Sequence, residues 1–488
     1  MLANCVNLNL LNLSKKRSKA IKMLFHSVCI SILLTIAVGV QELQMVIQNS
    51  RHGARSAISP DLFNYWPYPG ELTGNGMREH FVLGKEIRNR YGNLLPAIYD
   101  PKLFNVRSTM YNRTVQSIHS QLYGAFTDGN EQNAPQMPQP YDPVLAYPPL
   151  MSHIQYSDFG NSALPNNYTP IPVHVSETKY DQLLKGYQGK ACPIENLLWE
   201  GQKNAIVTEK QSFIEEAKPL IKEAIANKWI ESKDPNTFDT LSETAYMFDT
   251  IKADLNSGKP IPFYPNSSTW KKYEYLYNVF HHYMYNGNPV QYQLGSSIYL
   301  NDVLNTLINK TKGLRSEKYI IHSSHDSNLV SILSAFNILN VTCFESQYKN
   351  PKYNNSYCVF PSYASTLFFE LWADPNNLTN ASVKVKYDEQ VLPLCSTKDD
   401  SCDLNSFAKV IQKATNNYST FDYYQICNYG LPPQPTPTKT DSTRSLLALV
   451  ALGLLIAIGF AVKRQVYDTW KEETRKNQNL DYIRYQGH

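Results

Sequence analysis

Residues 50–55 read SRHGAR and place two arginines, Arg51 and Arg55, on either side of His52. Cationic groups this close repel one another unless an anion lies among them. The segment therefore predicts either an anion site at which a histidine is aimed, or a basic turn exposed to solvent. Because motifs this short often match by chance, the rest of the chain has to distinguish the two interpretations.

Two later segments share one arrangement, in which an expected strand runs into a turn with charged residues and then into a helix. Residues 103–126 predict such a unit with a turn that begins at Arg107, and residues 318–339 predict another with His325 and Asp326 in the turn. Strands that alternate with helices indicate an α/β core. In such a sheet these turns gather at the carboxyl ends of the strands, where ligands bind.

The gathered side chains have the types that phosphoryl transfer needs. Arginine forks match phosphate geometry, so Arg51, Arg55 and Arg107 can hold one phosphoryl group and offset its charge. A neutral imidazole such as that of His52 can attack phosphorus, which splits hydrolysis into two steps through a phosphohistidine. The leaving alcohol needs a proton, which the carboxylic acid of Asp326 can give. This scheme needs no metal, because guanidinium groups neutralise the charge.

Four blocks of sequence resemble, in order and spacing, the motifs of the histidine acid phosphatase family, in the branch of the lysosomal and prostatic enzymes. They are RHGARS, GELTGNGMREHFVLGKEIRNRY, VRSTMYNRT and HSSHDSNLVSIL, and the resemblance covers about residues 43–430. It implies an α/β fold with a mixed central sheet flanked by helices, a phosphoglycerate-mutase-like core, and a smaller helical cap domain over the site. It also implies an acid phosphatase that acts on phosphate monoesters with no cofactor and no metal.

The resemblance implies a role for each matching residue. His52 is the expected phosphate-accepting nucleophile and Asp326 the expected proton donor. The residues expected to bind phosphate are Arg51, Arg55, Arg107 and His325.

The cysteines of the body indicate disulfides. Six of them follow the leader, and an even number in an oxidising compartment predicts three bonds with fifteen connectivities. The family resemblance implies Cys192–Cys427 and Cys395–Cys402, with Cys343–Cys358 as the remaining pair.

Two apolar segments set the expected topology. Residues 23–40 follow a basic run and read as a secretory signal, with an uncleaved signal anchor as the alternative and Met23 as a second candidate start. Residues 445–462 carry no charge and precede Lys463-Arg464, which predicts a single span with a cytoplasmic C-terminus. The expected organisation is a signal peptide over 1–39, an ectodomain over 40–429 with a cap inserted at about 140–300, a Pro/Thr-rich stalk over 430–444, a transmembrane helix over 445–462 and a tail over 463–488.

Composition narrows the partners and the location. A formal charge of +4 over 488 residues is not typical of a nucleic-acid-binding protein. Asn-x-Ser/Thr sequons occur only before the expected span, as in a glycoprotein of the secretory pathway. We therefore expect a single-pass type I membrane protein in the lysosome, the vacuole or the cell surface, and leave open whether it is a homodimer.

Structural interpretations of the same residues stay open beside the catalytic ones. Arg107 suits a structural salt bridge, Asp326 suits a helix N-cap, and Arg113 is more typical of an ion pair in helix packing than of a substrate ligand. The alternative function is a catalytically weak homologue that binds phospholigands as a membrane receptor. A cytosolic enzyme of the phosphoglycerate mutase type conflicts with the leader, the span and the sequons.

Overall fold

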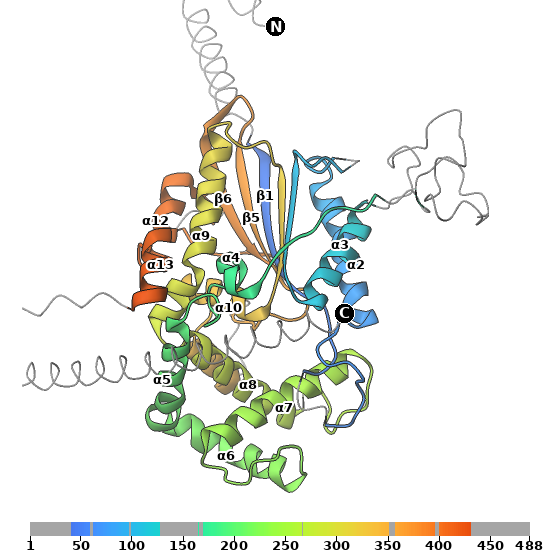
Figure 1. The fold of residues 1–488 in the computed structure, drawn as a ribbon, viewed down its shortest axis with the longest axis vertical. Helices are drawn as coiled ribbons and strands as arrows, with labels where there is room; N and C mark the ends of the chain where they lie inside the picture. Colours follow the sequence, from blue (N-terminus) through green and yellow to red (C-terminus); the bar gives the residue numbers. More distant parts are fainter. Residues whose placement is uncertain are drawn as a thin grey trace, which may run out of the picture. The chain divides into compact units, whose positions relative to one another are not determined.

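The computed structural model describes the body of the chain and shows an α/β architecture (Figure 1). The described residues are 41–58, 62–96, 99–126, 164, 169–265, 267–350, 357–395 and 400–430. Among them no helix is both long enough and apolar enough to span a bilayer. The expected signal peptide, stalk, transmembrane helix and tail lie outside the described residues.

One mixed sheet forms the centre of the body. Its strands, in spatial order, are β3 (His174–Ser176), β2 (Phe104–Thr109), β4 (Tyr319–Ser324), β1 (Glu42–Arg51), β5 (Thr366–Asp374), β6 (Asn377–Tyr387) and β7 (Gln390–Val391), and β8 (Cys402–Asp403) pairs with β6. The strands from β3 to β1 are parallel, whereas those from β1 to β7 are antiparallel. The predicted mixed sheet is therefore confirmed.

Helices cover both faces of this sheet (Figure 1). On one side lie α2 (Gly74–Tyr91) and α3 (Asn112–Phe126); on the other lie α9 (Pro289–Thr311), α12 (Leu404–Ala414) and α13 (Thr420–Tyr429). Shorter helices are α4 (Gln182–Lys185), α10 (Asp326–Ala335) and α11 (Val341–Lys349), with a 3₁₀ turn at η5 (Thr178–Tyr180). A further group lies beyond one end of the sheet: α5 (Ile194–Glu209), α6 (Gln211–Ala226), α7 (Phe238–Asn256) and α8 (Ser268–Asn286).

The two covered faces explain the pattern of residues in β1. Successive side chains of a strand point to opposite faces. Val46 belongs to the buried cluster that contains Ile118 of α3, whereas Met45 and Ile47 belong to the cluster that contains Leu300 of α9. A strand buried on both faces places its last residues in a dry environment, and Arg51 and His52 follow there.

The second strand–helix unit differs from its predicted form. β2 continues to Thr109, so Arg107 lies within the strand and pairs in register with His174 of β3 and His322 of β4. The turn comes later, and α3 begins at Asn112. The predicted turn at Arg107 is therefore wrong, because backbone pairing with β3 and β4 carries the strand three residues further, to Thr109.

Three disulfides join parts of the body, and they are the three expected pairs. Cys192, just before α5, bonds Cys427 in α13. The other two bonds are local, Cys343–Cys358 and Cys395–Cys402.

Candidate active site

β1 delivers the first site residues to the carboxyl end of the parallel strands. The backbone N–H of His52 donates to the carbonyl of Ser324 at 3.2 Å, and that of Arg51 donates to the carbonyl of Ser365 at 2.9 Å. Ser324 is the last residue of β4, so His52 lies beside the turn that carries His325. The two charged turns therefore meet at the edge where open α/β sheets bind ligands.

The loop after His52 packs directly against the start of α2. The N–H of Ala54 donates to the carboxylate of Glu79 at 2.7 Å. A Cβ atom on Gly53 would overlap the carbonyl of Gly76, so only glycine permits this approach. The contact holds the loop that follows His52 against α2.

His52 is buried and has one ring nitrogen in a defined role. Its Nδ1 lies 2.8 Å from the carbonyl oxygen of Gly53, which can only accept, so Nδ1 carries the hydrogen and Nε2 keeps its lone pair. Burial lowers the pKa of His52 well below its usual value, and the charges of Arg113 and Arg51 lower it further. The lowered pKa favours the neutral imidazole, in which Nε2 carries a lone pair.

The two arginines of the first segment are each paired with a carboxylate, that of Asp326 partly buried and that of Asp249 buried. Arg51 Nη2 lies 2.8 Å from Asp326, and Arg55 Nη2 lies 2.8 Å from Asp249 of α7. Arg51 also donates to the carbonyl of Pro361 at 2.7 Å. The basic segment is thus not a solvent-exposed turn, and both arginines are rigidly positioned.

Asp326 is the first residue of α10 rather than its cap, since His325 occupies the N-cap position. Its Oδ1 accepts from the N–H of Ser327 at 2.7 Å. Burial acts to raise the pKa of Asp326, but Arg51, His281 and Arg55 outweigh it and hold that pKa below its usual range. The carboxyl group is therefore ionised before an anion arrives.

His325 faces the same space as His52, and the two ring centroids are 5.5 Å apart. Arg113 Nη2 donates to His325 Nδ1 at 3.4 Å, so His325 Nε2 carries the hydrogen and donates to Thr109 Oγ1 at 3.0 Å. Burial lowers the pKa of His325 well below its usual value, with Lys185 and Arg113 adding to the effect. The ring is neutral and its tautomer is fixed.

The structure reverses the expected positions of Arg107 and Arg113: Arg113 lines the cavity at His52, and Arg107 forms an ion pair away from it. The Arg107 guanidinium lies 2.6 Å from Asp181 and 3.2 Å from Ser176 Oγ, and Arg107 is not among the residues that line the cavity at His52. Arg113, at the start of α3, does line that cavity. The structure therefore brings Arg51, His52, Arg55, His325 and Asp326 together, places Arg107 in a structural ion pair, and adds Arg113.

A cavity of about 170 Å³ is lined by His52, Arg55, Arg113, His325 and Asp326; Arg51 is not among its lining residues but is ion-paired with Asp326. Four buried nitrogen atoms of its lining residues have no hydrogen-bond partner within the described protein: Arg55 Nε, Arg113 Nε, His281 Nε2 and Asn286 Nδ2. Buried donors are normally satisfied, so unpartnered N–H groups on three residues that line one cavity, Arg55, Arg113 and Asn286, indicate a ligand rich in acceptors. A tetrahedral oxyanion supplies acceptors in several directions at once.

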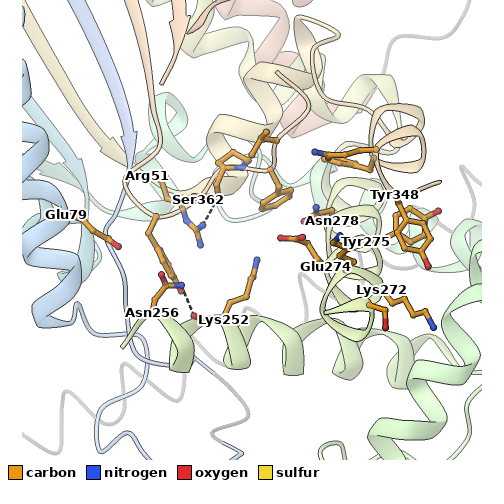
Figure 2. A pocket seen from close by; sticks show the side chains of 18 residues that line it. Arg51, Glu79, Lys252, Asn256, Lys272, Glu274, Tyr275, Asn278, Tyr348 and Ser362 are labelled. Atoms are coloured by element: carbon orange, nitrogen blue, oxygen red, sulfur yellow. Dashed lines mark hydrogen bonds between the residues drawn. The ribbon is translucent and has the colours of Figure 1, made fainter. Parts of the chain in front are cut away.

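Figure 2 shows a second, larger cavity, whose volume is about 810 Å³. Phe360 lines both this cavity and the small one. The wall of the larger cavity includes Arg51 and Lys252 together with Glu274. Tyr275 and Tyr348 of its lining stack with ring centroids 4.3 Å apart. The larger cavity is therefore of mixed charge and partly aromatic.

Within the described ranges, no group of three or more His, Cys, Asp or Glu side chains could hold a metal ion.

The sequence pattern gave no signal for Asp249, His281 and Asn286, which reach the cavity from α7 and α8. They lie far along the chain from the four motifs and have no motif of their own. Only the packing of α7 against α8, and of α8 against α10, identifies them.

Comparison with known families supports what the geometry indicates. The family model described as the histidine phosphatase superfamily (branch 2) matches residues 61–388. The chain belongs to this superfamily. The matched interval includes Arg113, His325 and Asp326 but begins after Arg55, so the match does not depend on the first charged segment.

Curated relatives and solved structures agree with this family. The chain is 24% identical over 434 residues to lysosomal acid phosphatase of Bos taurus, with 85% of this chain and 87% of that protein covered. It is 26% identical over 309 residues to prostatic acid phosphatase of Bos taurus, with 62% and 70% covered. The expected class of enzyme, an acid phosphatase, is thereby confirmed at the level of the family.

Among solved structures the fold is similar to that of Klebsiella sp. ASR1 phytase, with a TM-score of 0.53, 15% identity, and coverage of 78% of this chain and 96% of that one. The apo form of Hafnia alvei phytase gives a TM-score of 0.51 at 14% identity, with 77% and 97% covered. These likenesses show the fold alone.

Proposed function

We propose that this protein is an acid phosphatase that hydrolyses phosphate monoesters through a phosphohistidine at His52, without a metal. The observation that carries the proposal is the small cavity at His52, whose lining residues Arg55 and Arg113 each have a buried Nε without a hydrogen-bond partner in the described protein. A phosphoryl group there would accept from these donors and lie beside the nucleophilic Nε2. Preorganised donors of this kind stabilise the charge of the transition state.

In the first step, His52 Nε2 forms a bond to phosphorus as the bond from phosphorus to the ester oxygen breaks. Asp326, protonated, gives its proton to that oxygen, and the alcohol leaves. In the second step, the Asp326 carboxylate takes a proton from water, the water oxygen bonds to phosphorus, and the bond to Nε2 breaks. Inorganic phosphate and neutral His52 result, and Asp326 is protonated again.

The proposal accounts for an acidic optimum. Asp326 must be protonated to act, yet Arg51 holds its pKa below the usual range before substrate binds. A phosphate anion beside the carboxyl group raises that pKa, and an acidic medium supplies the proton. His52 tolerates the same acidity because its lowered pKa keeps it neutral.

In the phosphate-binding set we propose Arg113 in the place expected for Arg107. The set is then Arg51, Arg55, Arg113 and His325, whose Nε2–H leaves Thr109 in order to donate to phosphate. Arg107 does not contact phosphate in this proposal. Its ion pair with Asp181 holds in place the residue that caps the N-terminus of α4.

We also propose that the site faces the lumen of the secretory pathway or the cell exterior. The support is the apolar leader, the apolar segment at 445–462, the three disulfides and the lysosomal name of one relative. On this proposal the protein is a single-pass membrane protein of the lysosome, the vacuole or the cell surface.

The test is phosphate release from an aryl phosphate by the full-length protein between about pH 3 and pH 8 with chelator present. The expected result is chelator-resistant turnover that peaks in acid. His52→Ala is expected to abolish turnover, and Asp326→Asn to slow esters with poor leaving groups most. Saturable phosphate binding by folded protein without turnover at any pH would instead favour the phospholigand receptor.

A further inference from the structure

A buried lysine of α4 also lines the cavity at His52. Lys185, the last residue of that helix, is 2% exposed, although lysine is rarely buried without a partner. Its Nζ donates to Tyr187 Oη at 3.2 Å and lies 4.7 Å from the ring centroid of Tyr111. Within the described protein no carboxylate pairs with it.

The side chains around the cavity at His52 carry more positive than negative charge. Arg51 is paired with Asp326 and Arg55 with Asp249, each at 2.8 Å. The two cations that line the cavity without a paired carboxylate in the described residues are Arg113 and Lys185. A phosphate monoester, whose second pKa is about 6, carries at least one negative charge in acid, and these two cations can offset it.

We propose that Lys185 binds the phosphoryl group directly, together with Arg113. This inference rests on the proposed function, since it adds a phosphate-binding residue to the same site. A lysine Nζ has three donors on a flexible stem, and only one is used by Tyr187. The remaining donors are available to an oxyanion in the cavity.

Burial of the Lys185 ammonium group destabilises the folded protein, and this supports its assignment as a phosphate-binding residue. Burial lowers the pKa of Lys185 to about 7, with Arg113 lowering it and Asp326 and Asp181 opposing. The groups that face Lys185 are Tyr111 and Arg113 at the start of α3, Asp181 at the cap of α4, Tyr187 after it, and His325 and Asp326 at the start of α10. The Lys185 charge destabilises the protein when no substrate is bound, and it lies at the site proposed to bind a phosphate anion. This combination indicates that the charge serves to bind that anion.

The sign of the pH effect follows from this shift. In the unfolded chain a lysine keeps its ordinary pKa, near 10.4, whereas in the folded resting protein that of Lys185 is about 7. Below about pH 7 the buried charge is present and its destabilisation is complete. As pH rises from about 7 to about 10.4 the folded protein binds fewer protons than the unfolded chain, so this destabilisation is relieved.

The test compares full-length wild-type protein with Lys185→Met and with a matched control, Lys190→Met. Lys190 is exposed and does not line the cavity. The dissociation constant of inorganic phosphate is measured by calorimetry near pH 5, and the melting temperature is measured without phosphate. We expect Lys185→Met to weaken phosphate binding about tenfold, as for loss of a hydrogen bond to a charged group. We also expect its melting temperature to equal or exceed that of wild type, with the largest gain below about pH 7.

An unchanged phosphate affinity in Lys185→Met overturns the inference, whatever happens to the melting temperature. If that variant does not fold, wild-type protein is treated with a small acylating reagent, and the labelling of Lys185 and Lys190 is followed by mass spectrometry. Slower labelling of Lys185 alone when phosphate is present supports the inference, and equal rates overturn it.

Failure of the inference is distinguishable from failure of the proposed function, since phosphate binding is measured without turnover. Turnover by the wild type with unaltered phosphate affinity in Lys185→Met removes only the role of Lys185. Phosphate binding that depends on Lys185 in a protein without turnover removes only the hydrolase.

Discussion

At the scale of single residues, the motifs identify most of the site but not the carboxylate that holds Arg55. Residues that follow strand ends meet at one edge of a sheet, so His52, His325 and Asp326 were predictable as neighbours. Asp249 comes from the middle of a helix, 194 residues after Arg55. Only tertiary packing brings these two together, and no local pattern marks the aspartate.

The difference between Arg107 and Arg113 is the sharpest test at this scale. We expect Arg113→Met to lower kcat/KM about 100-fold or more, because a donor to the transition-state charge is lost. We expect Arg107→Met to leave kcat/KM within about threefold and to lower the free energy of unfolding by about 2 kcal/mol, because buried Asp181 loses its partner. Steady-state kinetics and denaturant unfolding of both variants measure this. The reverse pattern would restore Arg107 to the site.

At the scale of elements, the strands and helices that carry the motifs follow from apolar periodicity, but one boundary does not. The predicted strand at 43–50 and the helix within 70–92 correspond to β1 and α2. β2 is longer than predicted, because Arg107 is paired between two neighbouring strands, and polar residues in a strand give no periodic signal. Because β2 continues to Thr109, Arg107 lies within the strand, and the arginine at the start of α3 is Arg113.

The ion pair between Arg55 and Asp249 couples the loop after β1 to α7. Burial opposes ionisation of Asp249, but Arg55 and Lys252 lower its pKa to about 2. The stabilisation is therefore fully present above the unfolded pKa of about 3.9 and is lost as pH falls through about 2. The pair thus persists at the acidity expected for the enzyme.

We expect Asp249→Asn to lower the free energy of unfolding at about pH 5 by roughly 3 kcal/mol, because Arg55 loses its buried charged partner. The difference from wild type should shrink as pH falls from about 4 to 2, where the wild-type carboxylate is protonated as well. Denaturant unfolding of both proteins across this range measures the effect. A difference that is constant with pH would contradict the assigned pKa direction.

At the scale of the whole molecule, the disulfides close loops of very different length. Cys192–Cys427 spans 235 residues, whereas Cys395–Cys402 spans 7. The family resemblance implied these pairs, but cysteine positions alone left the connectivity open. In the chain-entropy account, a longer loop restricts the unfolded chain more.

We expect the paired change Cys192→Ala with Cys427→Ala to lower the free energy of unfolding by about 5 kcal/mol, as the loop length implies. The matched change Cys395→Ala with Cys402→Ala should lower it by about 2 kcal/mol. Unfolding of both variants without reductant gives the comparison. Equal losses would show that loop entropy does not govern the stability of this body.

The measurement that tests the central claim most directly is capture of the covalent intermediate. Full-length protein is mixed with an isotopically labelled phosphate monoester at acidic pH, quenched in alkali, and the labelled residue is located by mass spectrometry. The account predicts an acid-labile, alkali-stable phosphoryl group on His52, absent in His52→Ala and accumulating when the second step is slowed. Turnover with no label on His52, or with label on another residue, would contradict it.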